Sequence, residues 1–286
     1  RFDGDEGFRG SFNKYMQLKP EHYTGRIPEQ GIWMPFAPIR QVQGWEDFGF
    51  RFKEGDDQDY PLEVEHANAN DILVFHYQEM SSWWQPIDPS LPKTAATAVT
   101  QRDIAAAQGD PKAKMAQSAD MHNMIGNPYL QWLDVPWNKG AAWMINANPD
   151  IPGNPNSYNL YFGEAELAAR YSPTPPYING EYLDTLDGWP YSANYNRSHF
   201  PEANTPLVFS KVTYKPVIHR AFSSWEATKR IADRMHAEGH YLMANGTPHV
   251  YSMYMPWLDA AGNERNWLGS NGAFAPDDDA TLSKYR

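Results

Sequence analysis

The sequence contains no cysteine, which excludes disulfide bonds, thiolate metal sites and a cysteine nucleophile. It has no apolar run near the ~20 residues that a membrane-spanning helix needs, so we expect no membrane insertion. Positive charge is also scarce, because 24 Lys and Arg face 35 Asp and Glu, for a net charge of −11. Nucleic-acid binding needs a basic surface that neutralises phosphates, and this composition disfavours it.

Motifs of several common enzyme classes are missing as well. The nine histidines show no HExxH or other metal-binding spacing, so we expect no metal site. No Gly-rich phosphate loop precedes a helix, so we expect no nucleotide cofactor. No Gly-x-Ser-x-Gly elbow occurs, which disfavours a serine hydrolase.

Aromatic side chains are what the chain has in abundance, with 11 Trp, 17 Tyr and 13 Phe. Sugars pack their C–H faces on such rings while carboxylates and amides bind their hydroxyls, although the same rings also fill cores. The length of 286 residues suits one α/β barrel of about 250 residues, and we expect a single domain over residues 1–286. Because the chain begins with Arg1 and not Met, we expect it to be a piece of a longer protein.

Short apolar runs separated by longer polar segments are typical of parallel β-α units. They predict six strands, at residues 31–36, 71–78, 141–146, 180–184, 241–245 and 254–258. We expect the strands at 141–146, 180–184 and 241–245 to lie parallel in one sheet. An α/β barrel needs eight strands, so the barrel is expected to be incomplete in this chain.

Three helices are predicted from periodicity and end signals. They cover residues 8–23, residues 94–121 with a break at residues 109–111, and residues 223–238, where Ser223 and Glu226 form a capping box. Residues 37–70 have the composition of a loop. We interpret their acidic run, which contains Glu54, as a solvated surface.

Polar residues follow the C-terminal ends of the predicted strands, which is where parallel barrels build their active sites. The sharpest case is residues 182–189 (YLDTLDGW), where Asp184 ends an apolar run and Asp187 follows in a Gly-Trp turn. This segment resembles the nucleophile strand of (β/α)8-barrel glycoside hydrolases of the alpha-galactosidase and endo-alpha-N-acetylgalactosaminidase type. Residues 242–248 (LMANGTP) and 257–264 (WLDAAGNE) resemble the two strands that follow it in such barrels.

The resemblance implies a role for each of these side chains. Asp184 corresponds to the attacking nucleophile, and Asp187 is either a ligand for a substrate hydroxyl or the true carboxylate. Glu264 is the candidate general acid/base, with Asp259 and Glu79 as alternatives. The candidate substrate-binding residues, besides Asp187, are Trp189, Asn245, Trp33, Trp84, Asn146 and His249.

Glycosidic cleavage requires one carboxyl group to protonate the leaving oxygen and another to attack or to activate water. We therefore expect a glycoside hydrolase of the retaining type that acts on a polysaccharide or oligosaccharide, secreted or periplasmic. Two alternatives stay open. A non-catalytic carbohydrate-binding protein needs the rings but no paired acids, and a polysaccharide lyase would use a base such as His199, His249 or Tyr254.

Overall fold

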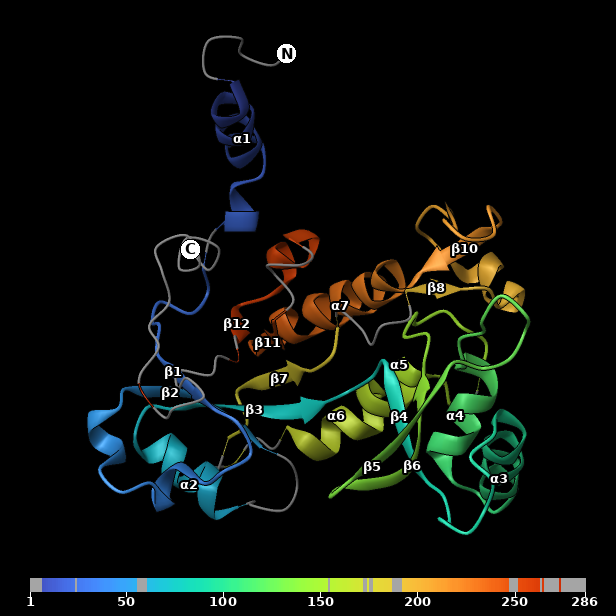
Figure 1. The fold of residues 1–286 in the computed structure, drawn as a ribbon. Helices are drawn as coiled ribbons and strands as arrows, with labels where there is room; N and C mark the ends of the chain where they lie inside the picture. Colours follow the sequence, from blue (N-terminus) through green and yellow to red (C-terminus); the bar gives the residue numbers. More distant parts are fainter. Residues whose placement is uncertain are drawn as a thin grey trace.

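The centre of the protein is one sheet of six parallel strands in the order β1-β2-β3-β7-β11-β12 (Figure 1). The computed structural model describes residues 7–23, 25–55, 61–153, 155–171, 174, 177–186, 192–246, 252–262, 264 and 273. The predicted α/β class is confirmed. The strands are β1 (Ile32–Met34), β2 (Phe50–Gly55), β3 (Leu73–Gln78), β7 (Gly180–Leu183), β11 (Tyr241–Asn245) and β12 (Ala260–Gly262).

The two edge strands of this sheet approach each other, so the sheet is a nearly closed barrel. A Cβ atom added to Gly262 on β12 would lie 3.0 Å from the indole of Trp33 on β1, and the indole therefore packs directly over this backbone. Large side chains from the strands between them fill the interior, which is typical of a packed parallel barrel. These are Phe52, Phe75, Tyr182 and Met243.

The outer face of the barrel is covered by helices, because alternate residues of each strand point outward. Val74 of β3 packs against α2 (Leu62–Ala69), and Leu242 of β11 packs against α7 (Arg220–Ala237). The predicted helix at 223–238 is thus present, but it begins three residues earlier. His219 caps it by accepting the Ala221 N–H, while Ser223 is buried inside the helix, so the predicted capping box is wrong.

Two of the barrel strands differ from the prediction. β2 lies in the segment that was expected to be an acidic loop, because the apolar residues at 50 and 52 alternate as in a strand and outweigh the acidic composition. Residues 56–60 of that acidic segment lie outside the described part of the chain. The run at 254–258 is a 3₁₀-helix, η6 (Ser252–Trp257), which contains Pro256, and β12 follows it.

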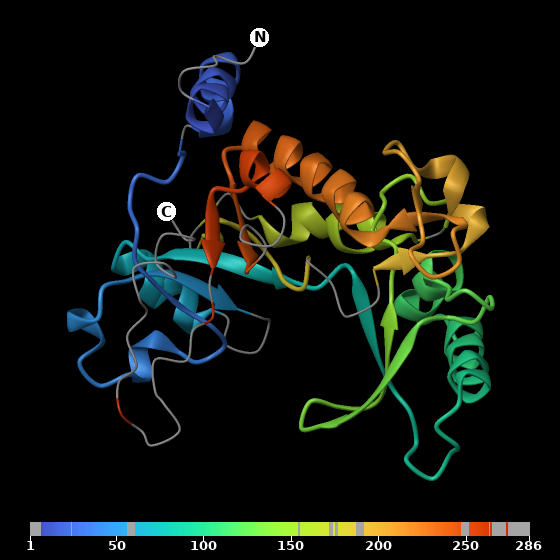
Figure 2. The same cartoon turned by 45° about the horizontal axis from the view of Figure 1, so that its top comes forward.

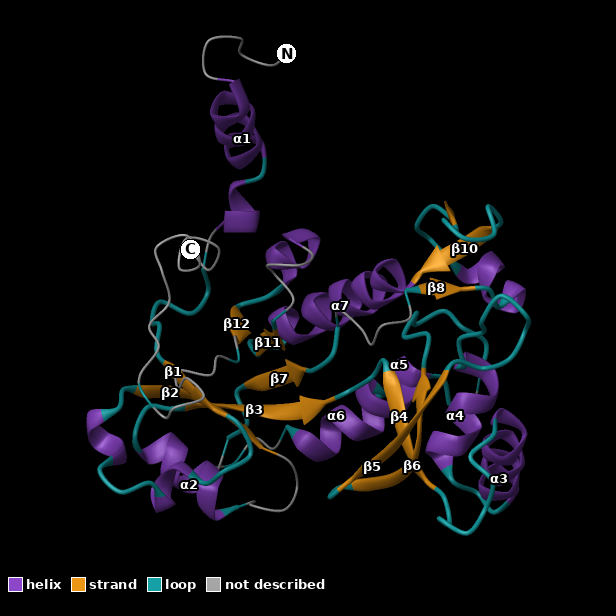
Figure 3. Cartoon of the chain, viewed as in Figure 1, coloured by secondary structure: helices purple, strands orange, loops and turns teal. Residues whose placement is uncertain are grey.

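The expected parallel strand at 141–146 belongs to a different sheet. β4 (Ser82–Pro86), β6 (Asn138–Met144) and β5 (Leu130–Val135) form an antiparallel ribbon that projects from the barrel (Figures 2 and 3). A two-residue turn at 136–137 joins β5 to β6. So short a connection allows only antiparallel pairing, because parallel strands need a much longer crossover. The prediction that 141–146 shares one parallel sheet with 180–184 and 241–245 is therefore wrong for 141–146, whereas β7 and β11 do pair in parallel.

The predicted break in the helix at 94–121 is confirmed. α3 (Ala95–Ala107) and α4 (Pro111–Ala119) are separate helices, and Asp110 caps the second by accepting the N–H groups of residues 112 and 113. Both helices pack on one face of the antiparallel ribbon, where Trp83 and Trp143 lie with ring centroids 5.8 Å apart.

The remaining elements lie around this frame. β8 (Ala193–Asn194), β10 (Pro216–His219) and β9 (Val208–Phe209) form a small antiparallel sheet. α1 (Gly7–Leu18) confirms the first part of the helix expected at 8–23, while η1 (Pro20–Tyr23) is a separate 3₁₀-helix; α1 stands apart from the barrel in Figures 1 and 2. No helix among the described residues is long and apolar enough to cross a membrane. The other short helices are η2 (Ile39–Gln41), η3 (Trp45–Asp47), α5 (Ser157–Phe162), α6 (Glu164–Arg170) and η4 (Arg197–Glu202).

Candidate active site

Polar side chains line the interior of the barrel at the C-terminal ends of its strands. Because side chains alternate along a strand, the residue two positions beyond an interior apolar residue also faces inward. Asp184 thus follows Tyr182 on β7, and Asn245 follows Met243 on β11. We call the resulting set of residues the polar layer, and it consists of Glu54, Tyr77, Asp184, Asn245 and Glu264.

Three hydrogen-bond donors hold the Asp184 carboxylate in place. Its Oδ2 accepts from the Tyr77 hydroxyl at 2.9 Å, and its Oδ1 accepts from Asn245 Nδ2 at 3.1 Å and from the Thr185 N–H at 2.8 Å. Thr185 has a φ of 56°, a left-handed conformation that a β-branched residue rarely adopts. The strained turn aims the N–H at the carboxylate and orients Asp184 toward the barrel mouth.

Asn245 joins Asp184 to Glu264. Its Nδ2 also donates to Glu264 Oε1 at 2.8 Å, so one amide nitrogen serves both carboxylates. Two oxygens at 3.1 and 2.8 Å from the same atom cannot be more than about 5.9 Å apart. The Glu264 side chain is exposed, whereas that of Asp184 is half-buried.

Glu54 is the polar-layer residue that the sequence analysis placed on the surface, and that interpretation is wrong. Only 1% of it is exposed, and none of the described residues forms a hydrogen bond with either of its carboxyl oxygens. Burial and the negative charges of Asp184 and Glu264 raise the pKa of Glu54 to about 8. The signal that could have found it is its position two residues beyond Phe52, which lies inside the barrel.

Tyr77 is a neutral hydrogen-bond donor in this setting. Burial, followed by the negative charges of Glu79 and Asp184, raises the pKa of the Tyr77 hydroxyl well above its ordinary range. The hydroxyl therefore keeps its proton at any physiological pH and donates it to Asp184.

Glu79 connects the polar layer to a neighbouring cavity of about 770 Å³, which β3, β4, α5, α6 and the start of α4 line. Its Oε2 lies 3.4 Å from the Tyr77 hydroxyl and accepts the indole N–H of Trp84 at 2.8 Å, while its Oε1 accepts from the Ser82 hydroxyl. Tyr77 is the polar-layer residue in the lining of this cavity, which contains neither Asp184 nor Glu264. The cavity volume is within the range of about 300–1,000 Å³ that ligand pockets occupy.

The two ring candidates inside the described residues lie at different places. Trp84 lines the cavity, and its ring centroid is 6.4 Å from that of Trp137, a side chain that is 74% exposed. Trp33 is in the barrel interior, 5.2 Å from the Tyr182 ring, and its indole nitrogen is buried with no hydrogen-bond partner among the described residues. The candidates Asp187, Trp189 and His249 lie outside the described residues.

Asp259 is a structural residue at the opposite end of the barrel. Its carboxylate binds His236 at 2.8 Å, Arg26 at 3.0 Å and the Leu242 N–H at 2.7 Å. Leu242 is near the start of β11, whereas Asn245 is its last residue. Asp259 is therefore not an alternative to Glu264 as an acid.

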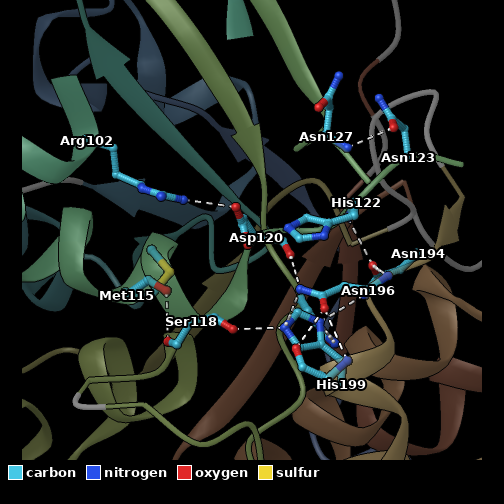
Figure 4. A network of polar contacts seen from close by, with 12 residues as sticks. Arg102, Met115, Ser118, Asp120, His122, Asn123, Asn127, Asn194, Asn196 and His199 are labelled. Atoms are coloured by element: carbon cyan, nitrogen blue, oxygen red, sulfur yellow. Dashed lines mark hydrogen bonds and ion pairs between the residues drawn. The ribbon is translucent and has the colours of Figure 1, made fainter. Parts of the chain in front are cut away.

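Asn146 also lies away from the polar layer, because the strand before it belongs to the antiparallel ribbon. Its buried amide contacts His199 at 3.1 Å. Figure 4 shows His199 surrounded by Asn194, Asn196 and the carbonyl of Ser118. This network joins α4 to the small antiparallel sheet and contains none of the polar layer.

The candidate bases for a lyase are occupied elsewhere. His199 belongs to the network in Figure 4, and the Tyr254 hydroxyl donates to the Ala221 carbonyl at 2.6 Å in a buried position. In the described ranges, no three His, Asp or Glu side chains are arranged to hold a metal ion.

Solved glycoside hydrolases show a limited likeness to the chain. The hydrolase domain of PelA from Pseudomonas aeruginosa is 13% identical over 88% of this chain and 73% of its own length, with a TM-score of 0.41. The alpha-N-acetylgalactosaminidase NagBb from Bifidobacterium bifidum is 9% identical over 87% of this chain and 41% of its own, with a TM-score of 0.47. A cycloalternan-degrading enzyme from Trueperella pyogenes is 11% identical over 82% of this chain and 30% of its own, with a TM-score of 0.33.

No protein-family model and no curated protein matches the sequence. The similar structures are glycoside hydrolases, but each TM-score is below 0.5. The functional assignment therefore rests on the geometry of the polar layer and not on these similarities.

Proposed function

We propose that the protein is a retaining glycoside hydrolase that uses Asp184 and Glu264. The observation that carries this proposal is the amide of Asn245, which donates to both carboxylates and keeps the two bonded oxygens within about 5.9 Å of each other. Retaining glycosidases hold their two carboxyl groups about 5–5.5 Å apart, whereas inverting ones leave about 6.5–9.5 Å for a water molecule. The separation favours the retaining geometry.

Asp184 acts as the nucleophile in this proposal. Its three hydrogen-bond donors fix the carboxylate at the barrel mouth, so an oxygen can attack the anomeric carbon while the bond from that carbon to the leaving oxygen breaks. The product of this step is a glycosyl ester of Asp184 and a free leaving group.

Glu264 acts as the general acid and then as the general base. In its protonated form it gives its proton to the leaving oxygen, and in the second step it takes a proton from the water that hydrolyses the glycosyl ester. Its exposed position suits both steps, since leaving group and water arrive from solvent.

The substrate class of the proposal is a polysaccharide or an oligosaccharide. The cavity beside the polar layer offers Trp84 as a stacking surface and adjoins Tyr77, so a chain longer than one ring has a place to bind. Because a polysaccharide does not cross membranes intact, the proposal includes a secreted or periplasmic location.

The test is hydrolysis of a panel of aryl glycosides and oligosaccharides by Asp184→Asn. We expect kcat/KM to fall by at least about 10³-fold with the fold retained, because the substitution keeps the shape and removes the charge. Added azide should restore turnover as a glycosyl azide. The matched control is Asp134→Asn, an exposed carboxylate on the antiparallel ribbon, which should behave like the unmodified protein.

Equal activity of Asp184→Asn and Asp134→Asn would remove the assignment. If neither these variants nor the unmodified chain turns over any glycoside, but the unmodified chain binds oligosaccharides, the protein is a non-catalytic carbohydrate-binding protein.

A further inference from the structure

Two tryptophan pairs lie on the antiparallel ribbon, and they differ in burial. Trp83 on β4 is 5% exposed and packs against Trp143 on β6, under helices α3 and α4. The next residue, Trp84, points to the other face of the ribbon, because side chains alternate along a strand. Its ring centroid is 6.4 Å from that of Trp137, which is 74% exposed. The second pair therefore lies outside the core.

Trp137 occupies a position where the turn itself does not require a large ring. It is the second residue of the two-residue turn between β5 and β6, at the tip of the ribbon that projects from the barrel (Figure 2). Such turns favour residues such as Gly, Asn and Asp. Isolated exposed apolar residues are common on proteins, whereas adjoining rings at the edge of a cavity are typical of a binding surface.

The pair continues a path that leads away from Asp184. The Tyr77 hydroxyl lies 2.9 Å from Asp184 Oδ2 and 3.4 Å from Glu79 Oε2. The indole N–H of Trp84 donates to the same Glu79 oxygen at 2.8 Å. These contacts keep Trp84 Nε1 within about 9 Å of Asp184 Oδ2.

The cavity connects these groups. Tyr77, Glu79 and Trp84 all line it, and Trp137 lies beyond Trp84, outside its lining. A chain that is held at Asp184 can thus pass through the cavity, cross the Trp84 ring and reach Trp137.

We propose that the substrate is a neutral polysaccharide whose chain extends from Asp184 through the cavity and stacks sugar rings on Trp84 and Trp137. This inference rests on the proposed glycosidase function and deepens it, because it selects a polymer over a short oligosaccharide and makes Trp137 a distal binding residue. Indole rings suit this task, since the C–H faces of sugars pack on them while the hydroxyls stay in water.

The charges of the cavity favour a neutral chain. Glu79 and Glu166 line it with negative charge, and Lys112 and Arg170 line it with positive charge. The Arg170 guanidinium pairs with the buried carboxylate of Glu181 at 2.6 Å, so its charge is already balanced. One lysine beside two carboxylates, in a chain with a net charge of −11, does not attract a polyanion. We expect neutral polymers to bind better than a polyuronate.

Affinity electrophoresis tests the inference without turnover. Native gels contain hydroxyethyl cellulose, amylose or galactan, with polygalacturonate as the anionic comparison, and Asp184→Asn is run so that the polymer is not hydrolysed. We expect at least one neutral polymer to retard Asp184→Asn, and polygalacturonate to retard it less. Adding Trp137→Ala to Asp184→Asn should raise Kd for that neutral polymer at least about fivefold, because one stacked ring is lost.

Two further variants control for the fold and for exposed rings in general. Trp137→Tyr keeps a ring at the tip of the ribbon, so its Kd should stay within about threefold of that of the Asp184→Asn parent. The matched control is Phe209→Ala, which removes a ring that is 71% exposed on the small antiparallel sheet and should leave Kd unchanged. Thermal unfolding of each variant checks that Tm is retained, as expected for exposed side chains.

Trp137-dependent binding by a protein that hydrolyses no glycoside would contradict the glycosidase function and leave the polysaccharide-binding surface in place. The inference itself is overturned, with the glycosidase assignment untouched, if none of the polymers retards Asp184→Asn or if Trp137→Ala leaves Kd unchanged. A dimer of the unmodified protein that Trp137→Ala dissociates in analytical ultracentrifugation would assign the ring to a contact between copies and would also overturn it.

Discussion

The Tyr77 hydroxyl, on β3, donates a 2.9 Å hydrogen bond to Oδ2 of Asp184, the residue that directly follows the adjacent strand β7. The two residues face the same interior because each is two positions beyond an apolar residue that lies inside the barrel. Asp184 is thereby tied to three elements at once: to β3 through Tyr77, to its own turn through Thr185, and to β11 through Asn245. A carboxylate held this way keeps one orientation before the substrate arrives.

Tyr77→Phe tests this orientation. We expect kcat to fall about 10–100-fold with KM nearly unchanged, because the substitution removes a hydrogen bond to a charged group but keeps the ring. The control is Tyr241→Phe, at the opposite end of the barrel, which should leave kcat unchanged. Steady-state kinetics of both variants measures kcat and KM separately. An unchanged kcat for Tyr77→Phe would show that the hydrogen bond from Tyr77 does not orient the Asp184 carboxylate.

Glu264→Gln tests the proton transfer. We expect kcat/KM for substrates with poor leaving groups to fall about 10²–10⁴-fold, because those oxygens must be protonated as they leave. Substrates with good leaving groups, such as dinitrophenyl glycosides, should lose far less in the first step. A plot of rate against leaving-group pKa measures this, and an equal loss for all substrates would assign Glu264 a role other than acid.

Trp84→Ala and Trp84→Phe separate the two functions of the Trp84 ring. Trp84→Ala should raise KM for oligosaccharides by about tenfold and leave a short aryl glycoside unaffected, since only the longer chain reaches the cavity. Trp84→Phe keeps a stacking ring but loses the N–H that donates to Glu79. Its KM for oligosaccharides should therefore lie between those of the unmodified protein and Trp84→Ala. The same KM change for short and long substrates would place Trp84 at the cleavage point itself.

His199 makes the fold sensitive to acid. Burial lowers the pKa of His199 below its usual 6.5, so the unfolded chain binds the proton at a higher pH than the folded chain does. Stability should therefore fall as the pH drops below about 6.5. His199→Gln should reduce this fall while costing about 1–3 kcal/mol at pH 8, because the network in Figure 4 loses contacts.

Urea unfolding at pH 5, 6, 7 and 8 measures the effect of His199. His22→Gln is the control, since His22 contacts only the peripheral segment near α1 and η6 in the described structure. Burial also lowers the pKa of His219 and His240, so part of the acid slope should remain in His199→Gln. An unchanged slope would show that the buried ring of His199 does not limit acid stability.

Much of the local structure follows from the sequence alone. The break between α3 and α4 is set by Gly109, Asp110 and Pro111, whose preferences act within a few residues. The positions of Asp184 and Asn245 at strand ends are equally local, because each directly follows an apolar run. Which strands carry polar groups at their ends can therefore be predicted from the sequence alone, without knowing which strands are neighbours.

What only the tertiary structure decided is which strand ends meet. The segments before Asn146 and Asn245 look alike in sequence, yet the turn at 136–137 sends one into an antiparallel ribbon while the other enters the barrel. Glu54 sits in an acidic run, and its burial depends on strands β1 and β3 that flank it from distant parts of the chain. Its raised pKa likewise arises from Asp184 and Glu264, more than a hundred residues away along the chain. Local pattern sets the direction of a side chain, whereas its charge state depends on the distant groups that the fold brings to face it.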